Sequence, residues 1–289
     1  MTANSKPKLQ FDRFAWFWRA PALIWQSAFF LAPLALVFAM SFWVVKSYRL
    51  TPDFVLKNWD RMLTRDYFWT AYLYTFEVSL LVAVLASVIA FPAAHYLAFK
   101  ASPTVRRWGI FFLVTPFFTS YLVRIYSWKI ILSNEGVINV MLGRLGLGPF
   151  ELLNNMTGAV IGYLTLCLPL TIIIQTFALS NVDRSLIGAA QNLGCSALRT
   201  TFKVTIPAAR IGLILAATFA FILTFGDYVS PSYLGGGSPP TMSILIVDQT
   251  KSGNNWPRAS VVAVTMVVTL ITVLFAALFA AYGRPGKAQ

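Results

Sequence analysis

Long apolar runs alternate with short polar segments along the 289 residues of the chain. A bilayer core about 30 Å thick requires roughly 20 mostly apolar residues for one helical crossing. The pattern predicts six membrane-spanning helices, at Ala22 to Val45, Tyr72 to Phe99, Trp108 to Ile131, Thr157 to Leu179, Ile211 to Gly226 and Ala259 to Tyr282. The fifth run could extend to Leu234. Gly226, Asp227 and Pro231 disfavour a lipid-facing helix beyond Gly226.

Composition supports a membrane protein. Hydrophobic residues make up 57% of the chain, charged residues only 11%, and the mean hydropathy is +0.68. A soluble domain of this size carries about a quarter charged residues, so the sequence indicates an all-α integral membrane protein. Cys167 and Cys195 are too far apart to indicate a disulfide framework or a metal site. The single histidine, His95, has no nearby acid or nucleophile, and no phosphate-binding loop is present.

Basic residues predict the orientation. If the amino terminus is cytoplasmic, 13 of the 23 lysines and arginines fall on the cytoplasmic side and eight on the other, with Arg124 and Lys129 at the end of the third run. This distribution favours cytoplasmic amino and carboxyl termini. The domain boundaries expected are a tail at 1–21, a six-span transmembrane domain at 22–282 with a cytoplasmic loop at 181–210, and a tail at 283–289.

The first tail is rich in aromatic residues. Phe11, Phe14 and Trp18 share one face of a possible helix, so this segment either lies along the membrane interface before Pro21 turns the chain inward or forms an aromatic belt without fixed structure. The first apolar run is too long for a cleaved signal peptide and is expected to stay as an anchor.

The net charge of +13 does not indicate nucleic-acid binding. The basic residues are divided among loops on both sides of the membrane and never form a long run with interleaved aromatic residues. Anionic lipid headgroups are the simpler counter-ions, so membrane lipids are expected partners and nucleic acid is not.

A polar island, "GAAQNLGCSALRTTFKVTIP", lies between the fourth and fifth runs, from Gly188 to Pro207. Leu186, Ala190, Leu193 and Ala197 recur at helical spacing and predict a short helix with an apolar stripe over 183–199. Small residues keep its surface thin enough for another protein to approach closely. It is interpreted either as a docking helix or as an amphipathic loop resting on the membrane.

The island resembles the EAA signature of permease subunits of binding-protein-dependent ABC importers. Ala189, Ala190, Gly194 and Pro207 match at the family spacing, whereas Gly188 replaces the family's glutamate. Two further segments, "TPFFTSYLVRIYSWKIILSNEGVIN" and "FGDYVSPSYLGG", resemble the spermidine and putrescine branch, most of all its first permease subunit. The ATPase-coupling residues that the resemblance implies are Gly188, Ala189, Ala190, Gly194 and Pro207.

The resemblance implies a type I ABC importer permease fold with a cytoplasmic coupling helix between spans four and five, in a bacterial inner membrane. It also implies a second permease, more in keeping with a paralogue than a copy, a dimer of ATPase subunits and an extracytoplasmic solute-binding protein. ATP and Mg would bind the ATPase, so this chain would hold no cofactor and catalyse no reaction. The missing glutamate removes one expected contact, for which Asp183 or Arg184 could compensate.

Ionisable and aromatic residues near the outer ends of the spans are candidates for the solute pathway. Glu77 could offer a counter-charge to a cationic solute, or it could pair with Arg124 or Lys129. Aromatic rings attract alkylammonium groups, although aromatic residues are also common at any membrane interface. The candidate pathway residues are Glu77, Tyr121, Tyr126, Trp128, Asp227 and Tyr228.

Two other classes of membrane protein have six or so spans or a polar interior. A secondary transporter or channel would be expected to show internal repeats or several intramembrane charges, and a membrane enzyme would need a polar catalytic cluster. Neither class explains the polar island. The sequence alone does not identify the solute, which is expected to be a polyamine or a related small cationic or amino-acid-like compound.

Overall fold

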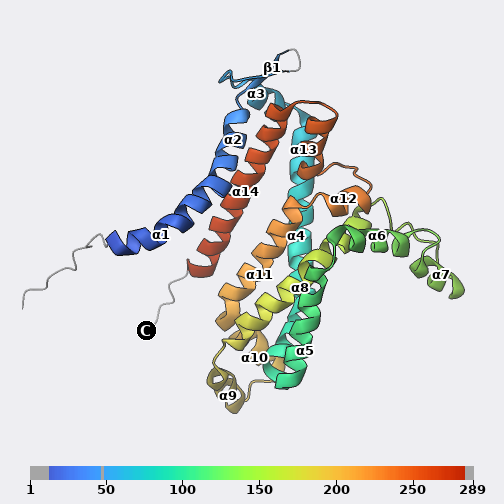
Figure 1. Cartoon of the computed structure of the whole chain (residues 1–289). Coiled ribbons are helices and arrows are strands. Elements are labelled where there is room, and N and C mark those ends of the chain that lie inside the picture. The colour runs from blue at the N-terminus through green and yellow to red at the C-terminus, as the bar shows by residue number, and fades with distance from the viewer. Residues whose placement is uncertain (1–12, 47–48, 284–289) are drawn as a thin grey trace, which may run out of the picture.

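The computed structural model describes residues 13–46 and 49–283, which are helical over most of their length (Figure 1). The first half contains α1 (Arg13–Gln26), the π-turn η1 (Ser27–Leu31), α2 (Ala32–Met40), β1 (Val44–Lys46), β2 (Arg49–Thr51), α3 (Lys57–Leu63), α4 (Asp66–His95), the π-turn η2 (Tyr96–Lys100), α5 (Pro103–Val114), the 3-10 turn η3 (Thr115–Phe118), α6 (Tyr121–Leu132) and α7 (Val137–Arg144). The second half contains α8 (Met156–Ser180), α9 (Arg184–Asn192), α10 (Ala197–Thr200), the π-turn η4 (Thr201–Thr205), α11 (Ile206–Gly226), α12 (Val229–Tyr233), α13 (Met242–Lys251) and α14 (Trp256–Tyr282).

The described residues form five helices long and apolar enough to span a membrane, and a bent helix pair brings the number to six. The predicted all-α architecture with six spans is confirmed. The fourth and sixth spans match the predicted runs closely, because α8 covers Met156–Ser180 and α14 covers Trp256–Tyr282. The predicted end of the fifth span at Gly226 also matches the end of α11.

The first span begins earlier than the apolar run and ends earlier too. Helices α1 and α2 join through η1 into a candidate span at Phe17–Met40, and Pro21 lies inside α1, so the expected turn at this proline is wrong. The predicted interfacial face with Phe11 and Phe14 lies outside the described side chains. At the other end, Asn58 Nδ2 donates to the carbonyls of Ser41 and Trp43 at 3.2 and 2.6 Å. These bonds satisfy carbonyls beyond the helix end and let the chain turn into the β1–β2 hairpin.

The third predicted span is not one straight helix. Its two halves, Pro103–Phe118 and Tyr121–Arg144, are bent by 95° at Thr119 and Ser120. The carbonyl of Pro116 accepts hydrogen bonds from Thr119 Oγ1 at 2.8 Å and from Arg124 Nη1 at 3.4 Å, which offers the backbone an alternative to the helical ladder. The expected continuous helix from Trp108 to Ile131 is therefore wrong, and α6 and α7 extend sideways from the bundle (Figure 1).

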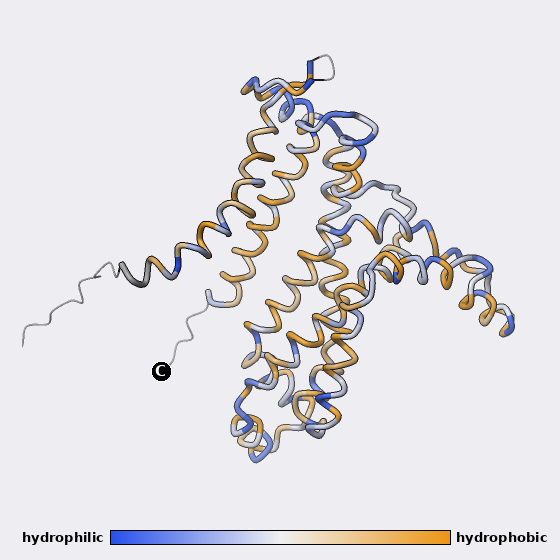
Figure 2. Tube along the Cα trace, viewed as in Figure 1, coloured by the Kyte–Doolittle hydropathy of each residue, from blue (hydrophilic) through white to orange (hydrophobic). Residues whose placement is uncertain are grey.

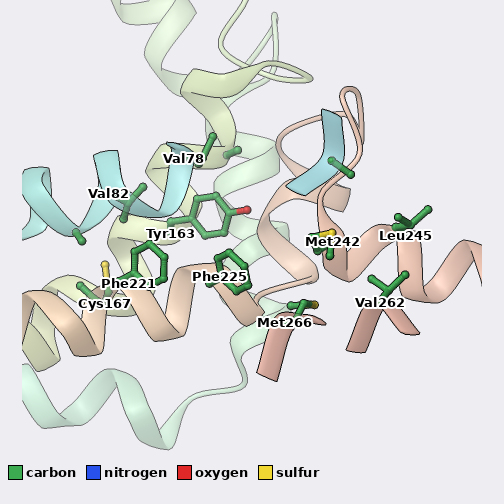
Figure 3. Packing of buried hydrophobic residues seen from close by; sticks show 14 of the residues in the cluster. Val78, Val82, Tyr163, Cys167, Phe221, Phe225, Met242, Leu245, Val262 and Met266 are labelled. Carbon is green, nitrogen blue, oxygen red and sulfur yellow. The ribbon is translucent and has the colours of Figure 1, made fainter. Parts of the chain in front are cut away.

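Helices α4, α8 and α11 pack against one another at the centre of the bundle. The main cluster of buried apolar side chains combines residues from these helices with others from α13 and α14 (Figure 3). Phe221 and Phe225 stack with ring centroids 5.4 Å apart, beside Tyr163 of α8. Several of the buried α4 residues are alanines, which allow close approach of the helices where lipid-like surroundings give no hydrophobic gain.

Polar residues gather at the two ends of the bundle. Figure 2 shows apolar residues along its length and hydrophilic segments around the β1–β2 hairpin at one end and around α9 and α10 at the other. This distribution matches a structure whose middle lies in hydrocarbon and whose ends lie in water. It places the polar island at one end of the bundle, where a soluble partner can reach it.

Candidate functional site

Two groups of predicted residues lie far apart in the structure. The polar island forms α9 and α10, whereas Tyr121, Asp227 and their neighbours surround the break between α11 and α12. The 21 residues of α11 separate the two groups. At about 1.5 Å per residue that helix is roughly 30 Å long, so the groups face opposite sides of a bilayer core.

The polar island is two short helices rather than the single helix predicted over 183–199. Asp183 Oδ1 accepts a hydrogen bond from Ser185 N at 2.9 Å and caps the start of α9. Hydrogen bonds from Ser185 hold the pKa of the Asp183 carboxyl below its usual value. The helix ends at Asn192, and Ser196 caps the start of α10. Ala197 therefore does not continue the apolar stripe of α9, and that part of the prediction is wrong.

Gly194 ends α9 in a Schellman motif. Its φ is +81°, its N–H donates to Gln191 O at 2.9 Å, and Cys195 N donates to Ala190 O at 3.1 Å. A β-carbon on Gly194 would meet nothing within 4 Å in this chain. The left-handed backbone therefore explains the glycine here, because residues other than glycine rarely adopt that conformation. A close approach by another protein, the reason suggested by sequence, stays a prediction.

The apolar side chains of the island are not buried by the chain itself. Leu186, Leu193 and Leu198 are 51%, 86% and 74% exposed. Ala189 is exposed, and a β-carbon on Gly188 would meet nothing within 4 Å. An exposed apolar surface of this kind next to thin, small residues is typical of a protein interaction site.

Pro207 lies in a continuous helix rather than at the end of the island. The segment Ala197–Gly226 forms one candidate span in which the π-turn η4 immediately precedes Ile206 and Pro207. Because proline has no N–H and its ring crowds the preceding turn, a local widening to a π-turn is a common accommodation. The predicted boundary between the island and the fifth span is thus corrected: the helix begins at Ala197, ten residues before Pro207, rather than at Ile211.

Asp227 is buried where α11 ends, and only 8% of it is exposed. Its carboxylate accepts hydrogen bonds from Val229 N at 2.8 Å and Ser230 N at 3.2 Å, and so caps the short helix α12. The Tyr121 hydroxyl donates to Asp227 Oδ2 at 2.5 Å and lies 2.6 Å from Ser230 Oγ. Since the single Tyr121 proton goes to the carboxylate, Ser230 Oγ donates to the tyrosine oxygen. The group joins α6 to α12.

Two glycines of α8 allow α12 to lie close by. A β-carbon on Gly162 would meet Ser230 Oγ and Leu234 Cδ1 at 2.8 Å, and one on Gly158 would meet Leu234 O at 2.5 Å. They stand four residues apart on one face of the helix, the spacing of small residues at close helix contacts in membranes. Sequence reasoning missed Gly158, Gly162 and Ser230, although the GxxxG spacing was visible.

The other predicted pathway residues are distributed around this group. The Tyr126 ring lies 5.1 Å from the ring of Tyr233 in α12, and Tyr228 is half-buried beside Asp227. Trp128 is half-buried on α6, and no ring contact joins it to the group within the described ranges. The structure therefore brings Tyr121, Tyr126 and α12 together and leaves Trp128 aside.

Glu77 lies on α4 with its side chain exposed. The alternative pairing with Arg124 or Lys129 is not found, because the described residues form a single ion pair, between Lys46 and Asp53. A carboxylate within a membrane span is costly unless it faces water, a cation or another protein. Glu77 is therefore an exposed carboxylate that forms no ion pair within the described residues.

Comparisons with known proteins agree on the kind of protein. Residues 83–284 match the family described as binding-protein-dependent transport system inner membrane component. The chain is 28% identical over 215 residues to the spermidine/putrescine transport system permease protein PotB of Escherichia coli, which covers 74% of this chain and 78% of that protein. It is also 28% identical over 250 residues to PotB of Haemophilus influenzae, covering 83% and 84% of the two chains.

The fold is similar to that of a solved transporter. A chain in the crystal structure of a bacterial alginate ABC transporter, in complex with an alginate pentasaccharide-bound periplasmic protein, superposes with a TM-score of 0.73. The match covers 92% of this chain and 93% of that chain at 17% sequence identity. At that identity the similarity bears on the fold, and it agrees with the type I permease architecture.

Proposed function

Because the chain belongs to the family of binding-protein-dependent transport inner membrane components, and is thus a multi-pass permease subunit of an ABC importer in the inner membrane, we propose that its solute is a polyamine. The relatives named above are permeases of spermidine and putrescine transport systems. The observation that carries the proposal is their similarity over 74% and 83% of the chain. The exposed carboxylate of Glu77 supports a cationic solute, since it offers a counter-charge within a span.

The pathway is proposed to run along the exposed side of α4 and past the outer end of α11. Glu77 would meet the amine groups, and Tyr126 and Tyr228 offer aromatic faces that attract alkylammonium ions by about 0.5 to 2 kcal/mol. Asp227 has a different role in this proposal. Its carboxylate is buried and already accepts three hydrogen bonds, so together with Tyr121 it fixes α12 rather than binding solute.

The end of the bundle with α9 and α10 is proposed to dock on an ATPase subunit, where ATP and Mg bind. The exposed Leu186 and Leu193 form the apolar part of that surface, and Gly188 and Ala189 keep it thin. Movement of the ATPase dimer would then pull on α9 and, through α10, directly on the long helix ending at Gly226. Alternating access by such rigid-body motion requires no chemistry in this chain.

We further propose that both termini and α9 are cytoplasmic, and that a second, paralogous permease and an extracytoplasmic binding protein complete the importer. Six crossings return the chain to its starting side. Figure 1 shows the start of α1 and the end of α14 directed toward the half of the bundle that carries α9. The excess of basic residues on that side supports its cytoplasmic placement.

Reconstitution tests the proposal. The permease is assembled in proteoliposomes with the second permease, the ATPase and the binding protein encoded with it, and ATP hydrolysis and uptake are measured with putrescine, spermidine, amino acids and opine-like compounds. Stimulation by a polyamine at lower concentration than by the other solutes is expected. Stimulation by a neutral amino acid alone would refute the polyamine assignment while leaving the family membership intact.

A further inference from the structure

Two adjoining cavities lie at the end of the bundle that carries α9. The first, of about 460 Å³, lies between the end of the α4–η2 helix and the island of α9 and α10. The second, of about 470 Å³, lies between η2 and the first turns of α5. Phe99 and Arg184 line both cavities, so the two are neighbours around these side chains.

The walls of these cavities are basic. Lys100 and Arg184 line the first, and Arg106 and Arg107 join Arg184 in the second. Within residues 13–46 and 49–283, none of these four side chains takes part in an ion pair. The nearest acid in the sequence, Asp183, directs one carboxylate oxygen to Ser185 N in the cap of α9. Four positive charges therefore share one region without a carboxylate partner.

Two of the arginines are held by a single carbonyl oxygen. Arg106 Nη2 donates to Ala98 O at 2.5 Å, Arg184 Nη2 donates to the same atom at 3.3 Å, and Arg106 Nε donates to Leu97 O at 2.7 Å. These bonds satisfy carbonyls at the end of a helix, where intrahelical donors run out. A carbonyl carries only a partial charge, however, so capping fixes the two guanidinium groups in place without neutralising them.

An apolar surface continues from the basic region along α5. Phe111 stands four residues after Arg107, on the same face of the helix. Trp108, Phe111 and Phe112 are all more than half exposed, and their rings contact one another at centroid distances of 5.6 to 6.1 Å. A ligand that fits this surface has an anionic head and a long apolar tail.

We propose that the two cavities bind the phosphate headgroup of an anionic phospholipid, such as phosphatidylglycerol, with its acyl chains along the aromatic face of α5. Basic pockets between membrane helices are suited to such headgroups, and arginine binds phosphate through paired N–H groups. The aromatic face favours a lipid over free phosphate, which would leave that surface unused. It also favours a lipid over an acidic segment of a soluble partner, because α5 enters the apolar layer directly after Arg107.

The site would link the lipid to the coupling surface. Arg184 is the first residue of α9, so an anion bound in the cavities contacts the helix proposed to dock on the ATPase. The cavities and their charges do not depend on the solute or on that docking. The binding test below therefore stands or falls separately from the proposed function.

Photo-crosslinking tests the site in the assembled importer. A phosphatidylglycerol with a photoreactive acyl chain is added in detergent, and adducts are mapped by mass spectrometry to peptides containing residues 99–112. Competition is measured with unlabelled phosphatidylglycerol, phosphatidylcholine of the same chain length and inorganic phosphate. Crosslinking within this peptide that only phosphatidylglycerol displaces is expected.

Charge variants locate the binding. The Arg107 side chain makes no hydrogen bond within the described residues, so Arg107→Gln should leave the fold intact while lowering phosphatidylglycerol affinity about fivefold, the effect of roughly one surface charge. Lys100→Gln combined with Arg107→Gln should lower it by about 25-fold. Gly188→Glu adds a carboxylate to the wall of the first cavity, at a position where a β-carbon would meet nothing within 4 Å in this chain. It should also weaken binding.

Arg199→Gln is the matched control, since Arg199 is an exposed cation of the same end of the bundle that lines neither cavity. Its affinity for phosphatidylglycerol should equal that of the unaltered chain. Equal losses in Arg107→Gln and Arg199→Gln would mean general surface attraction and would overturn the site. Equal competition by phosphatidylcholine would overturn the headgroup assignment, and displacement by millimolar inorganic phosphate would overturn the lipid in favour of a free anion.

Discussion

Gly194 offers a direct test of the docking surface, because the structure separates two reasons for a glycine at this position. Its φ of +81° disfavours any other L-residue, and the left-handed conformation costs such a residue about 1 to 2 kcal/mol. That cost is nearly the same for alanine and leucine. A β-carbon on Gly194 would meet nothing within 4 Å in this chain, so the space next to the backbone is open for a side chain until a partner covers the surface.

The perturbation is therefore a pair of substitutions, Gly194→Ala and Gly194→Leu. If α9 lies in a close-packed cleft of the ATPase, Gly194→Leu should bind the ATPase more weakly than Gly194→Ala does. The difference in binding free energy should be the cost of overfilling a packed contact, about 1 to 3 kcal/mol. That difference corresponds to roughly 5- to 150-fold in the dissociation constant. Gly194→Asn should destabilise the end of α9 less than either of these substitutions, since asparagine tolerates the left-handed region.

The assay is co-purification of the ATPase from membranes, followed by its binding affinity and solute-stimulated ATP hydrolysis in the reconstituted importer. Gly146→Leu is the control. Gly146 has a φ of +75° and open space within 4 Å, but it lies just after α7, in the part of the chain that extends sideways from the bundle. Wild-type association, hydrolysis and uptake by Gly194→Leu would refute the coupling role of α9 and leave it as a passive surface loop.

Three further predictions concern the membrane domain. Single cysteines in place of Ser5 or Ala288, in a chain without its native cysteines, should resist an impermeant thiol reagent in intact spheroplasts; labelling there would contradict the cytoplasmic placement of the termini. Glu77→Gln should raise the polyamine concentration needed for half-maximal ATP hydrolysis and leave assembly with the ATPase unchanged, because it removes a counter-charge but no contact within this chain. An unaltered concentration dependence would exclude Glu77 from the pathway. Tyr121→Phe should lower the free energy of unfolding by about 1.5 to 3 kcal/mol, the contribution of a hydrogen bond to a charged group, because Asp227 loses a donor. The loss should appear as a lower melting temperature in detergent. An unchanged melting temperature would contradict the role of Tyr121 in fixing α12.

The break in the third span shows where hydropathy stops being informative. The residues on both sides of Thr119 are apolar enough to continue a membrane helix, so a sliding window joins them. The bend depends on hydrogen bonds to the Pro116 carbonyl and on the bond from Tyr121 to Asp227, a residue 106 positions away. The sequence around Thr119 does not contain Asp227, so the hydropathy of this segment alone cannot reveal the bend.

The polar island shows a similar division. Its position between two spans, its small residues and the EAA-like spacing were readable, and with them the family, which the match over residues 83–284 confirms. The division into α9 and α10 was missed because an apolar residue recurred at the right spacing on both sides of Gly194. The glycine itself was the available signal, since glycine with a left-handed backbone commonly ends a helix.

The sequence by itself determined the number of spans, the membrane class and the position of the polar island at one end of the bundle, because burial in hydrocarbon requires long apolar helices and leaves polar residues only at their ends. Tertiary structure decided which polar groups meet. Asp227 is buried and accepts hydrogen bonds from Tyr121 and Ser230, whereas Glu77 is exposed. Arg106 and Arg184 donate to the same carbonyl oxygen. These pairings depend on how helices far apart in sequence pack and rotate, and hydropathy along a single chain carries no information about that rotation when nearly every face is apolar.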